Sequence, residues 1–359
     1  MHIITKKILF SPDTMSEPIS LFHKNFLIFD IETTGFSRDH AIIYMIGCIY
    51  KKDGSYEYCN IFASDSSKEE DMIRYFFNML KDFNCLISFN GNNFDIPFLL
   101  ARAKKHSIKE TISLLESIDI YGLLRPFRKC LSFSNLKLDT VQNELGYARK
   151  DTATGGDLIH IYHAYAREPY HPYYKLLLLH NKEDVEGMIP LLPLIDIFIL
   201  IEAYHFDFLS TDEINKKIVA TYALPHKAGV DFVLSHQGCE LKFSVNQQTV
   251  KFTLPFCHDK KKRFFENFKD YMYIPEKDEV IHKSIANFMP AHQKIKSKKS
   301  NCYISYSGVF IPVFTLKGVE QPFKDSFKSK QHYTLLNPHL NANFFKQQLL
   351  AFLKNCKES

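Results

Sequence analysis

Up to about residue 195, short apolar runs alternate with longer stretches in which apolar residues recur every three or four positions. The short runs predict strands over Phe26–Ile31, Ile42–Tyr50, Tyr56–Ala63, Cys85–Phe89 and Ser117–Ile120. The longer stretches predict helices over Glu70–Lys81, Phe94–His106, Leu136–Leu145, Asp157–Arg167 and Tyr174–Met188. Strands that alternate with helices are typical of an α/β fold.

After residue 195 the apolar residues alternate with polar ones instead. Three such runs lie at Val230–Leu234, Cys239–Val245 and Val250–Phe256, with polar turn residues between them. This period predicts an antiparallel meander. With a helix expected over Glu279–Phe288, the second part is an α+β domain. We therefore expect two domains, 20–195 and 212–359.

The composition is that of an ordinary globular protein. A length of 359 residues suffices for about two domains. Hydrophobic residues make up 45% and charged residues 24%, which argues against a disordered chain.

Charge divides at the same place as the pattern. The whole chain carries 45 basic and 40 acidic residues, a net charge of +5. Up to Ile195 we count 22 basic and 24 acidic residues, and after it 23 and 16, so the two parts carry −2 and +7. The small total therefore conceals a basic second part.

Nothing in the sequence predicts a membrane or secretory segment. No long apolar run follows Lys6 and Lys7, so we expect no secretory signal. The most apolar stretch, 188–201, contains two prolines and an aspartate and is shorter than the ~20 residues of a membrane span. The eight cysteines form no Cys-x-x-Cys pair, which argues against a zinc site. We expect a cytoplasmic protein whose cysteines fill the core.

The first candidate motif is Asp30-Ile31-Glu32-Thr33-Thr34-Gly35, directly after an apolar strand. Side chains alternate along a strand, so Asp30 and Glu32 point to the same face. Two carboxylates on one face repel each other unless a cation neutralises them, and oxygen ligands suit Mg²⁺ or Mn²⁺. A strand end with two solvated acids is the alternative.

Two further acidic motifs follow in order. Asn90-Gly91-Asn92-Asn93-Phe94-Asp95 joins a strand to a helix, and Asp95 falls in the first turn of that helix, where an acid can also serve the helix dipole. In His180-Asn181-Lys182-Glu183-Asp184, the His and the last Asp are four positions apart, so they share a helix face, as an ordinary ion pair also would.

Taken together, these motifs resemble the DEDD 3′–5′ exonuclease superfamily, and most closely its YprB-like ribonuclease-H-like branch. The resemblance covers roughly residues 25–195 and implies a ribonuclease-H-like mixed sheet flanked by helices. It implies that Asp30, Glu32, Asp95 and Asp184 hold two divalent cations, Mg²⁺ or Mn²⁺, and that His180 is a general base of the histidine subtype. It further places Thr33, Thr34 and Asn90 near the substrate.

The function that this resemblance implies is metal-dependent hydrolysis of phosphodiester bonds at 3′ ends of DNA or RNA, single-stranded ends above all. His180, expected to be neutral at physiological pH, would take a proton from the attacking water. Two alternatives stay open. One is an interaction module with weak or no activity, and the other is a structure-specific endonuclease.

Two basic runs mark the second domain. Lys260–Arg263 precede Phe264 and Phe265, and four lysines follow between residues 294 and 299. Cations neutralise phosphates, and exposed aromatics stack on unpaired bases. We therefore expect nucleic-acid contact there, with Phe264, Phe265, Tyr303 and Tyr306 as stacking candidates. A solvated loop beside core phenylalanines is the alternative.

Overall fold

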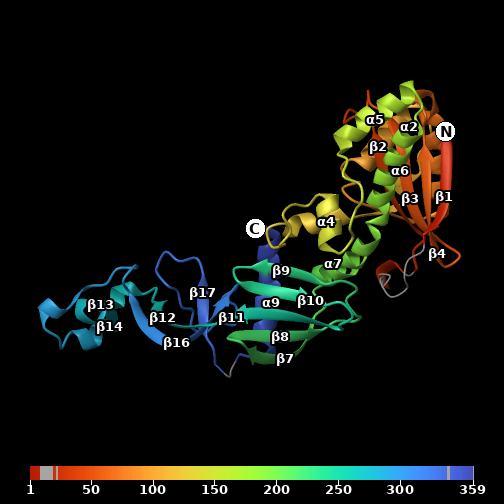
Figure 1. The fold of residues 1–359 in the computed structure, drawn as a ribbon. Helices are drawn as coiled ribbons and strands as arrows, with labels where there is room; N and C mark the ends of the chain where they lie inside the picture. The colour runs from red at the N-terminus through yellow and green to blue at the C-terminus, as the bar shows by residue number, and fades with distance from the viewer. Residues whose placement is uncertain (9–18, 22, 338–339, 359) are drawn as a thin grey trace.

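A computed structural model describes residues 1–8, 19–21, 23–337 and 340–358. The chain forms an elongated molecule with an α/β part at one end, a five-stranded sheet in the middle and a narrow arm at the other end (Figure 1). Residues 338–339 and 359 of the predicted second domain lie outside the described part.

A six-stranded mixed sheet organises the first part, in the order β1-β4-β3-β2-β5-β6. The neighbours from β1 to β2 run antiparallel, and β5 runs parallel to both β2 and β6. The strands are β1 (His2–Ile8), β2 (Phe26–Thr33), β3 (Ile43–Lys52), β4 (Ser55–Phe62), β5 (Cys85–Ser88) and β6 (Glu116–Asp119). The five predicted strands are thus confirmed, and β1 is additional.

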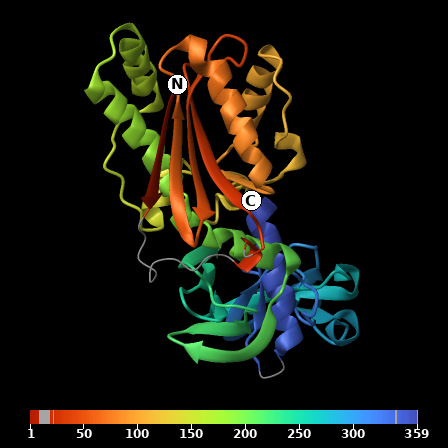
Figure 2. The same cartoon turned by 90° about the vertical axis from the view of Figure 1, so that its right-hand side faces the viewer.

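Helices cover both faces of this sheet (Figure 2). The helices of this part are α1 (Glu69–Met79), α2 (Asp95–Lys105), α3 (Ile120–Leu124), α4 (Leu138–Glu144), α5 (Gly155–Arg167) and α6 (His171–Glu186). Helices α1 and α2 pack on one face and α5 and α6 on the other. On β2, Leu27, Phe29 and Ile31 pack with residues of α1 and α2. The alternate residues, Asp30 and Glu32 among them, therefore point to the opposite face, against which α6 packs.

The second part contains the predicted meander. An antiparallel sheet in the order β7-β8-β11-β10-β9 consists of β7 (Asp207–Ile214), β8 (Lys217–Ala223), β9 (Phe232–His236), β10 (Cys239–Phe243) and β11 (Thr249–Pro255). Gln237 and Gly238 have φ of 51° and 78°, the left-handed conformations that a two-residue hairpin turn requires. The last helix, α9 (Ala342–Glu358), packs on this sheet, with the rings of Phe352 and Phe252 5.1 Å apart.

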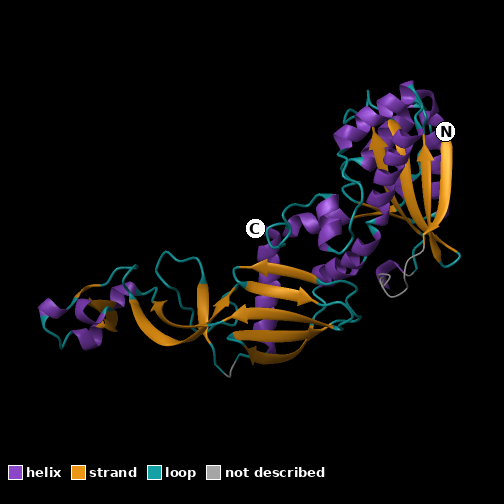
Figure 3. Ribbon diagram, viewed as in Figure 1, coloured by secondary structure: helices purple, strands orange, loops and turns teal. Residues whose placement is uncertain are grey.

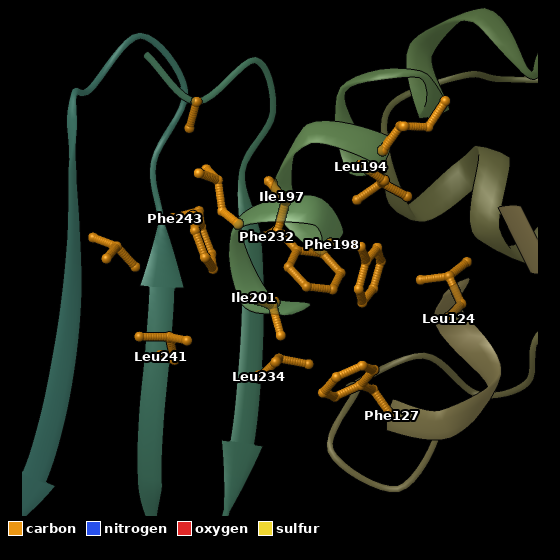
Figure 4. Packing of buried hydrophobic residues seen from close by; sticks show 14 of the residues in the cluster. Leu124, Phe127, Leu194, Ile197, Phe198, Ile201, Phe232, Leu234, Leu241 and Phe243 are labelled. Atoms are coloured by element: carbon orange, nitrogen blue, oxygen red, sulfur yellow. The ribbon is translucent and has the colours of Figure 1, made fainter. Parts of the chain in front are cut away.

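Helix α7 (Pro193–Ala203) joins the two parts. Leu194 and Phe198 on this helix face Leu124 and Phe127, while Phe232 and neighbouring residues of β9 and β10 lie on the other side (Figure 4). One buried cluster runs from Phe26 and Ile28 of β2 through α7 to α9. The predicted boundary at 195–212 therefore lies beside a shared core and not in an open linker.

The arm consists of two small sheets (Figure 3). One has the order β12 (Cys257–Phe264), β16 (Tyr303–Val313), β17 (His332–Leu335), and the other β14 (Glu279–His282), β13 (Tyr271–Ile274), β15 (Ile295–Lys296). The predicted helix over Glu279–Phe288 is wrong, because Glu279–His282 pair with β13 and only α8 (Lys283–Ala286) is helical. The β-branched pair Val280-Ile281 suits a strand.

Short 3₁₀ helices complete the secondary structure, at Ile19–Leu21, Ser66–Lys68, Leu80–Asp82, Ile112–Leu114, Arg125–Phe127, Ile189–Leu191, Phe268–Asp270, Pro275–Lys277 and Ala291–Gln293. Within the described ranges, none of the helices combines the length and the apolar character needed to cross a bilayer. None of the eight cysteines, which all lie within the described residues, forms a disulfide, and all but Cys257 are buried.

Candidate functional site

Two of the candidate acids meet at the end of β2. Asp30 and Glu32 lie on one face of this strand, and Asp30 accepts a hydrogen bond from Asn181 Nδ2 of α6 at 3.2 Å. Asp95, the first residue of α2, accepts the Ile31 backbone N–H at 3.1 Å. That bond ties the helix start to the strand that carries the other two acids.

The third motif closes the site from α6. His180 Nε2 lies 3.7 Å from a carboxylate oxygen of Glu32 and 3.2 Å from one of Asp184. Oxygens of Glu32 and Asp184 and a nitrogen of His180 all lie within 4.8 Å of one another. Strand β2 and helix α6 therefore bring together residues that are about 150 positions apart in the chain.

A segment before α5 completes the arrangement. Asp151 Oδ2 lies 2.5 Å from His180 Nδ1, and Arg149 donates a hydrogen bond to Asp184. Glu183 of α6 holds this segment, because it accepts the backbone N–H groups of Lys150 and Asp151 at 2.9–3.1 Å. The same helix thus presents His180 and Asp184 and fixes the loop that contacts them.

Burial and like charge dominate the electrostatics of the acids. Burial, and then the carboxylates of Asp184, Asp95 and Glu32, raise the pKa of Asp30 well above its ordinary value. Burial raises the pKa of Glu32 to about 8 and that of Asp95 to about 7. Arg149 lowers the pKa of Asp30, and His180 and Arg149 lower that of Glu32, but burial and the neighbouring carboxylates outweigh them in both cases.

His180 differs from expectation. Burial lowers its pKa, but the hydrogen bond and the charge of Asp184, followed by Glu32 and Asp151, raise it to about 9. Without a bound cation the imidazole is therefore protonated at neutral pH, contrary to the neutral base expected from the sequence. The carboxylates around it are the physical cause.

The donor set fits divalent cations. It offers carboxylate oxygens, which Mg²⁺ and Mn²⁺ prefer as ligands, from separate elements of the fold. The raised pKa values of these carboxyl groups indicate that a positive charge nearby would stabilise their ionised form. Glu32, His180 and Asp184 form the tightest group, and Asp30 and Asp95 lie within electrostatic reach of Asp184.

Two open grooves meet over the acids. One of about 770 Å³ contains Asp30, Asn90, Arg128, Lys137 and Asp184 in its lining, and one of about 520 Å³ contains Lys137, Asp151, His180 and Asp184. Lys137 and Asp184 belong to both. The lining of the larger groove thus combines acids, cations and the aromatic side chains of Phe89 and Tyr121, a composition suited to a phosphate chain with bases.

The three candidate substrate residues have local roles in the structure. Thr33 Oγ1 donates to Gly35 O, and Thr34 Oγ1 accepts the Ile42 N–H, so both hydroxyls hold the turn after β2. Asn90 lines the larger groove, with φ of 64° and its backbone N–H donated to Asp119. Contact of these residues with substrate stays a prediction.

Sequence reasoning missed Arg149, Asp151 and Asn181. Asn181 follows His180 directly within the third motif, and this position in the motif could have indicated that it belongs to the site. The glycine at position 47 is a second sequence feature linked to Asn181, because a Cβ at Gly47 would lie 2.1 Å from Asn181 Oδ1. Asp151 and Arg149 have no spacing signal, since a loop brings them to the site.

The first part of the chain is similar to known proteins. Residues 27–195 match the family model of the RNase_H superfamily. The chain is 26% identical over 192 residues to a DNA polymerase catalytic subunit of Saimiriine herpesvirus 2 (strain 11), a match covering 38% of this chain and 19% of that protein. The chain thus spans about a fifth of the length of that relative.

A solved structure, the family B DNA polymerase of the archaeon Pyrobaculum calidifontis, matches with a TM-score of 0.40 and 15% identity over 69% of this chain and 34% of that one. The match of residues 27–195, together with the mixed sheet and its flanking helices, identifies the first part of the chain as an RNase H-like domain.

Proposed function

We propose that this protein is a metal-dependent 3′–5′ exonuclease of the DEDD histidine subtype, in the YprB-like branch of the RNase H-like fold. The observation that carries the proposal is the convergence of Glu32, His180 and Asp184 within 4.8 Å, beside Asp30 and Asp95. Four acids on two helices and one strand are more than helix capping or a surface ion pair requires.

In this proposal Asp30, Glu32, Asp95 and Asp184 hold two divalent cations. Such ions, when bound, activate a water for attack on the phosphate and stabilise the leaving 3′ oxygen. Asn181 donates a hydrogen bond to Asp30, and the Ile31 N–H donates one to Asp95, and these bonds hold the carboxylates close together. Their raised pKa values favour exchange of protons for cations.

His180 is the proposed general base, and Asp151 orients it. The Asp151 carboxylate accepts from Nδ1, so Nε2 is the nitrogen that faces Glu32 and Asp184. Only the deprotonated Nε2 accepts a proton, and added positive charge near the imidazole lowers its pKa from about 9 toward neutrality. Arg149, bonded to Asp184, keeps that carboxylate in place.

The larger groove favours a single strand as substrate. Phe89 and Tyr121, whose rings lie 5.7 Å apart, line this groove and offer aromatic contacts to an unpaired base. The exposed Arg128 and Lys137 also line it and suit phosphates.

Cleavage polarity tests the proposal. Single-stranded DNA and RNA labelled at the 5′ end are incubated with Mg²⁺ or Mn²⁺, alongside a circular single strand. We expect a descending ladder from the linear strand and no cleavage of the circle. Cleavage of the circle indicates an endonuclease, and no metal-dependent cleavage of any strand indicates a binding module.

A further inference from the structure

The arm contains a groove with an aromatic floor, at the opposite end of the molecule from β2 and α6 (Figure 1). It has a volume of about 420 Å³, and Phe264, Phe265, Phe327 and Leu316 line it. The rings of Phe264 and Phe327 lie 5.7 Å apart, and Phe327 is 44% exposed. The groove therefore offers an open ring face instead of a closed core.

Cations stand at the edge of this floor. Lys299 and Lys324 line the groove, with Glu266 as the acid of its lining. Residues 280–300 hold five lysines and no Asp or Glu. Lys296, Lys298 and Lys299 are exposed and make no ion pair with any residue in the described part of the chain. Their charges are thus available to a ligand.

Two lysines of the other basic run, Lys261 and Lys262, have partners within the arm. Lys261 is buried between Asp259 and Asp325, and Lys262 donates to Tyr303 Oη and lies over that ring. Tyr303 is itself buried and bonded to Asp278. Lys262 and Tyr303 thus connect the first small sheet to Asp278, which lies between β13 and β14 of the second, so neither Lys261 nor Lys262 is available to a ligand.

We propose that this groove binds single-stranded nucleic acid, with a base stacked on the exposed ring of Phe327, which Phe264 supports from its edge, and phosphates beside Lys299. Aromatic floors accept any unpaired base, and lysines at the rim neutralise the backbone without reading sequence. Bases inside a duplex are already stacked on each other, so a duplex does not use the floor. The choice of nucleic acid over another polyanion rests on the proposed function.

The test measures binding without cleavage. Full-length protein carrying Asp30→Asn as a common background is titrated, in EDTA, into a fluorescein-labelled oligo-dT or oligo-rU, and anisotropy is recorded. The groove variants are Phe327→Ala and Lys299→Ala. Matched controls are Leu209→Ala, an exposed apolar residue on β7, and Lys346→Ala, an exposed lysine on α9.

We expect Phe327→Ala to weaken binding at least about fivefold, and Phe327→Tyr, which keeps a ring, to bind as the background protein does. Lys299→Ala should lower the slope of log Kd against log salt by roughly 0.7. The controls should change neither quantity. If both groove variants bind like the controls, or if polyglutamate competes as well as the oligonucleotide, the inference is overturned.

The outcome is separable from that of the proposed function. If the parent chain hydrolyses nucleic acid but both groove variants bind like their controls, only the arm inference is lost. If no hydrolysis is found and the groove variants still lose affinity, the arm inference stands and the nuclease proposal is lost.

Discussion

Asp151 binds Nδ1 of His180 and so determines that Nε2 faces the acids. A substitution of Asp151 therefore tests the role of His180 at the scale of one residue. Asp151→Asn removes a carboxylate that stabilises the imidazolium, so the pKa of His180 should fall from about 9. We expect the single-turnover rate to drop roughly 10–100-fold, as for other partners that orient a functional His.

The measurement is the pH profile of that rate, with selective NMR titration of His180 in the metal-free protein. Asp207→Asn, an exposed acid on β7, is the charge-matched control. An unchanged profile with an unchanged His180 titration would show that Asp151 has no positioning role.

The acids also predict how metal-free stability depends on pH. Glu32 and Asp95 have folded pKa values of about 8 and 7 against ordinary values of 4.5 and 3.8, so the folded state binds more protons in between. Stability should therefore fall as pH rises from about 4 to 8. His180 acts in the same direction, because the stability from its raised pKa is lost between 6.5 and about 9.

Urea denaturation in EDTA at several pH values measures how the free energy of unfolding changes with pH. Glu32→Gln removes one of the carboxyl groups with a raised pKa and should make this change smaller. Mg²⁺ or Mn²⁺ should raise stability most at the alkaline end, where protons no longer compete. Stability that rises over this range in EDTA would contradict the electrostatic account.

At the residue scale the sequence identified the acids and His180, because their spacing on strands and helices is visible in one dimension. Alternation placed Asp30 and Glu32 on one face, and the four-residue spacing placed His180 and Asp184 on another. Arg149 and Asp151 were invisible, since their position depends on Glu183 holding a loop. The protonation of His180 was equally hidden, because it arises from three-dimensional neighbours.

At the scale of elements, the contact between β3 and α6 sets the distance between the acids. Gly47 on β3 leaves space for Asn181, which is fully buried and donates to Asp30. Gly47→Ala would place a Cβ 2.1 Å from Asn181 Oδ1, so α6 or Asn181 must move. We expect a loss of about 1–3 kcal/mol in the free energy of unfolding, with reduced hydrolysis.

Gly156→Ala is the control, because its added Cβ would meet only Thr154 Oγ1 at an ordinary 3.8 Å. Chemical denaturation of both variants measures the difference. Equal stability of the two variants would mean that the α6–β3 contact is not as tight as described.

Element types were predictable where the apolar period is long. The strands and helices around the acids follow it, and so does the meander of β9, β10 and β11. Strand β1 was missed because most of its residues are exposed and its pattern is weak. Residues 279–288 were misassigned, because a short run carries no decisive period and pairing with β13 decides its conformation.

At the scale of the whole molecule, α7 links the RNase H-like domain to the five-stranded sheet through one core. Phe198 is buried against both Phe127 and Phe232, with ring distances of 5.3 and 5.5 Å. Phe198→Ala should cost about 3–5 kcal/mol and destabilise both sides of the junction together. Ile199→Ala, the next residue but 48% exposed, should cost little.

Hydrogen exchange detected by mass spectrometry checks this coupling. Protection should fall in β2 and β5 as well as in β9–β11 of Phe198→Ala. Loss confined to one side would mean that the two parts unfold separately.

The acids around His180 form the proposed metal-dependent nuclease site. The most direct test is single-turnover hydrolysis of end-labelled single-stranded DNA and RNA, with Mg²⁺ or Mn²⁺ and with EDTA, by the wild type, Asp184→Asn and the control Asp207→Asn. We predict that the wild type and the control cleave only with the metal, and that Asp184→Asn retains its fold by circular dichroism but does not cleave. Equal cleavage by Asp184→Asn, or cleavage by the wild type in EDTA, would show that these acids do not form a metal-dependent nuclease site.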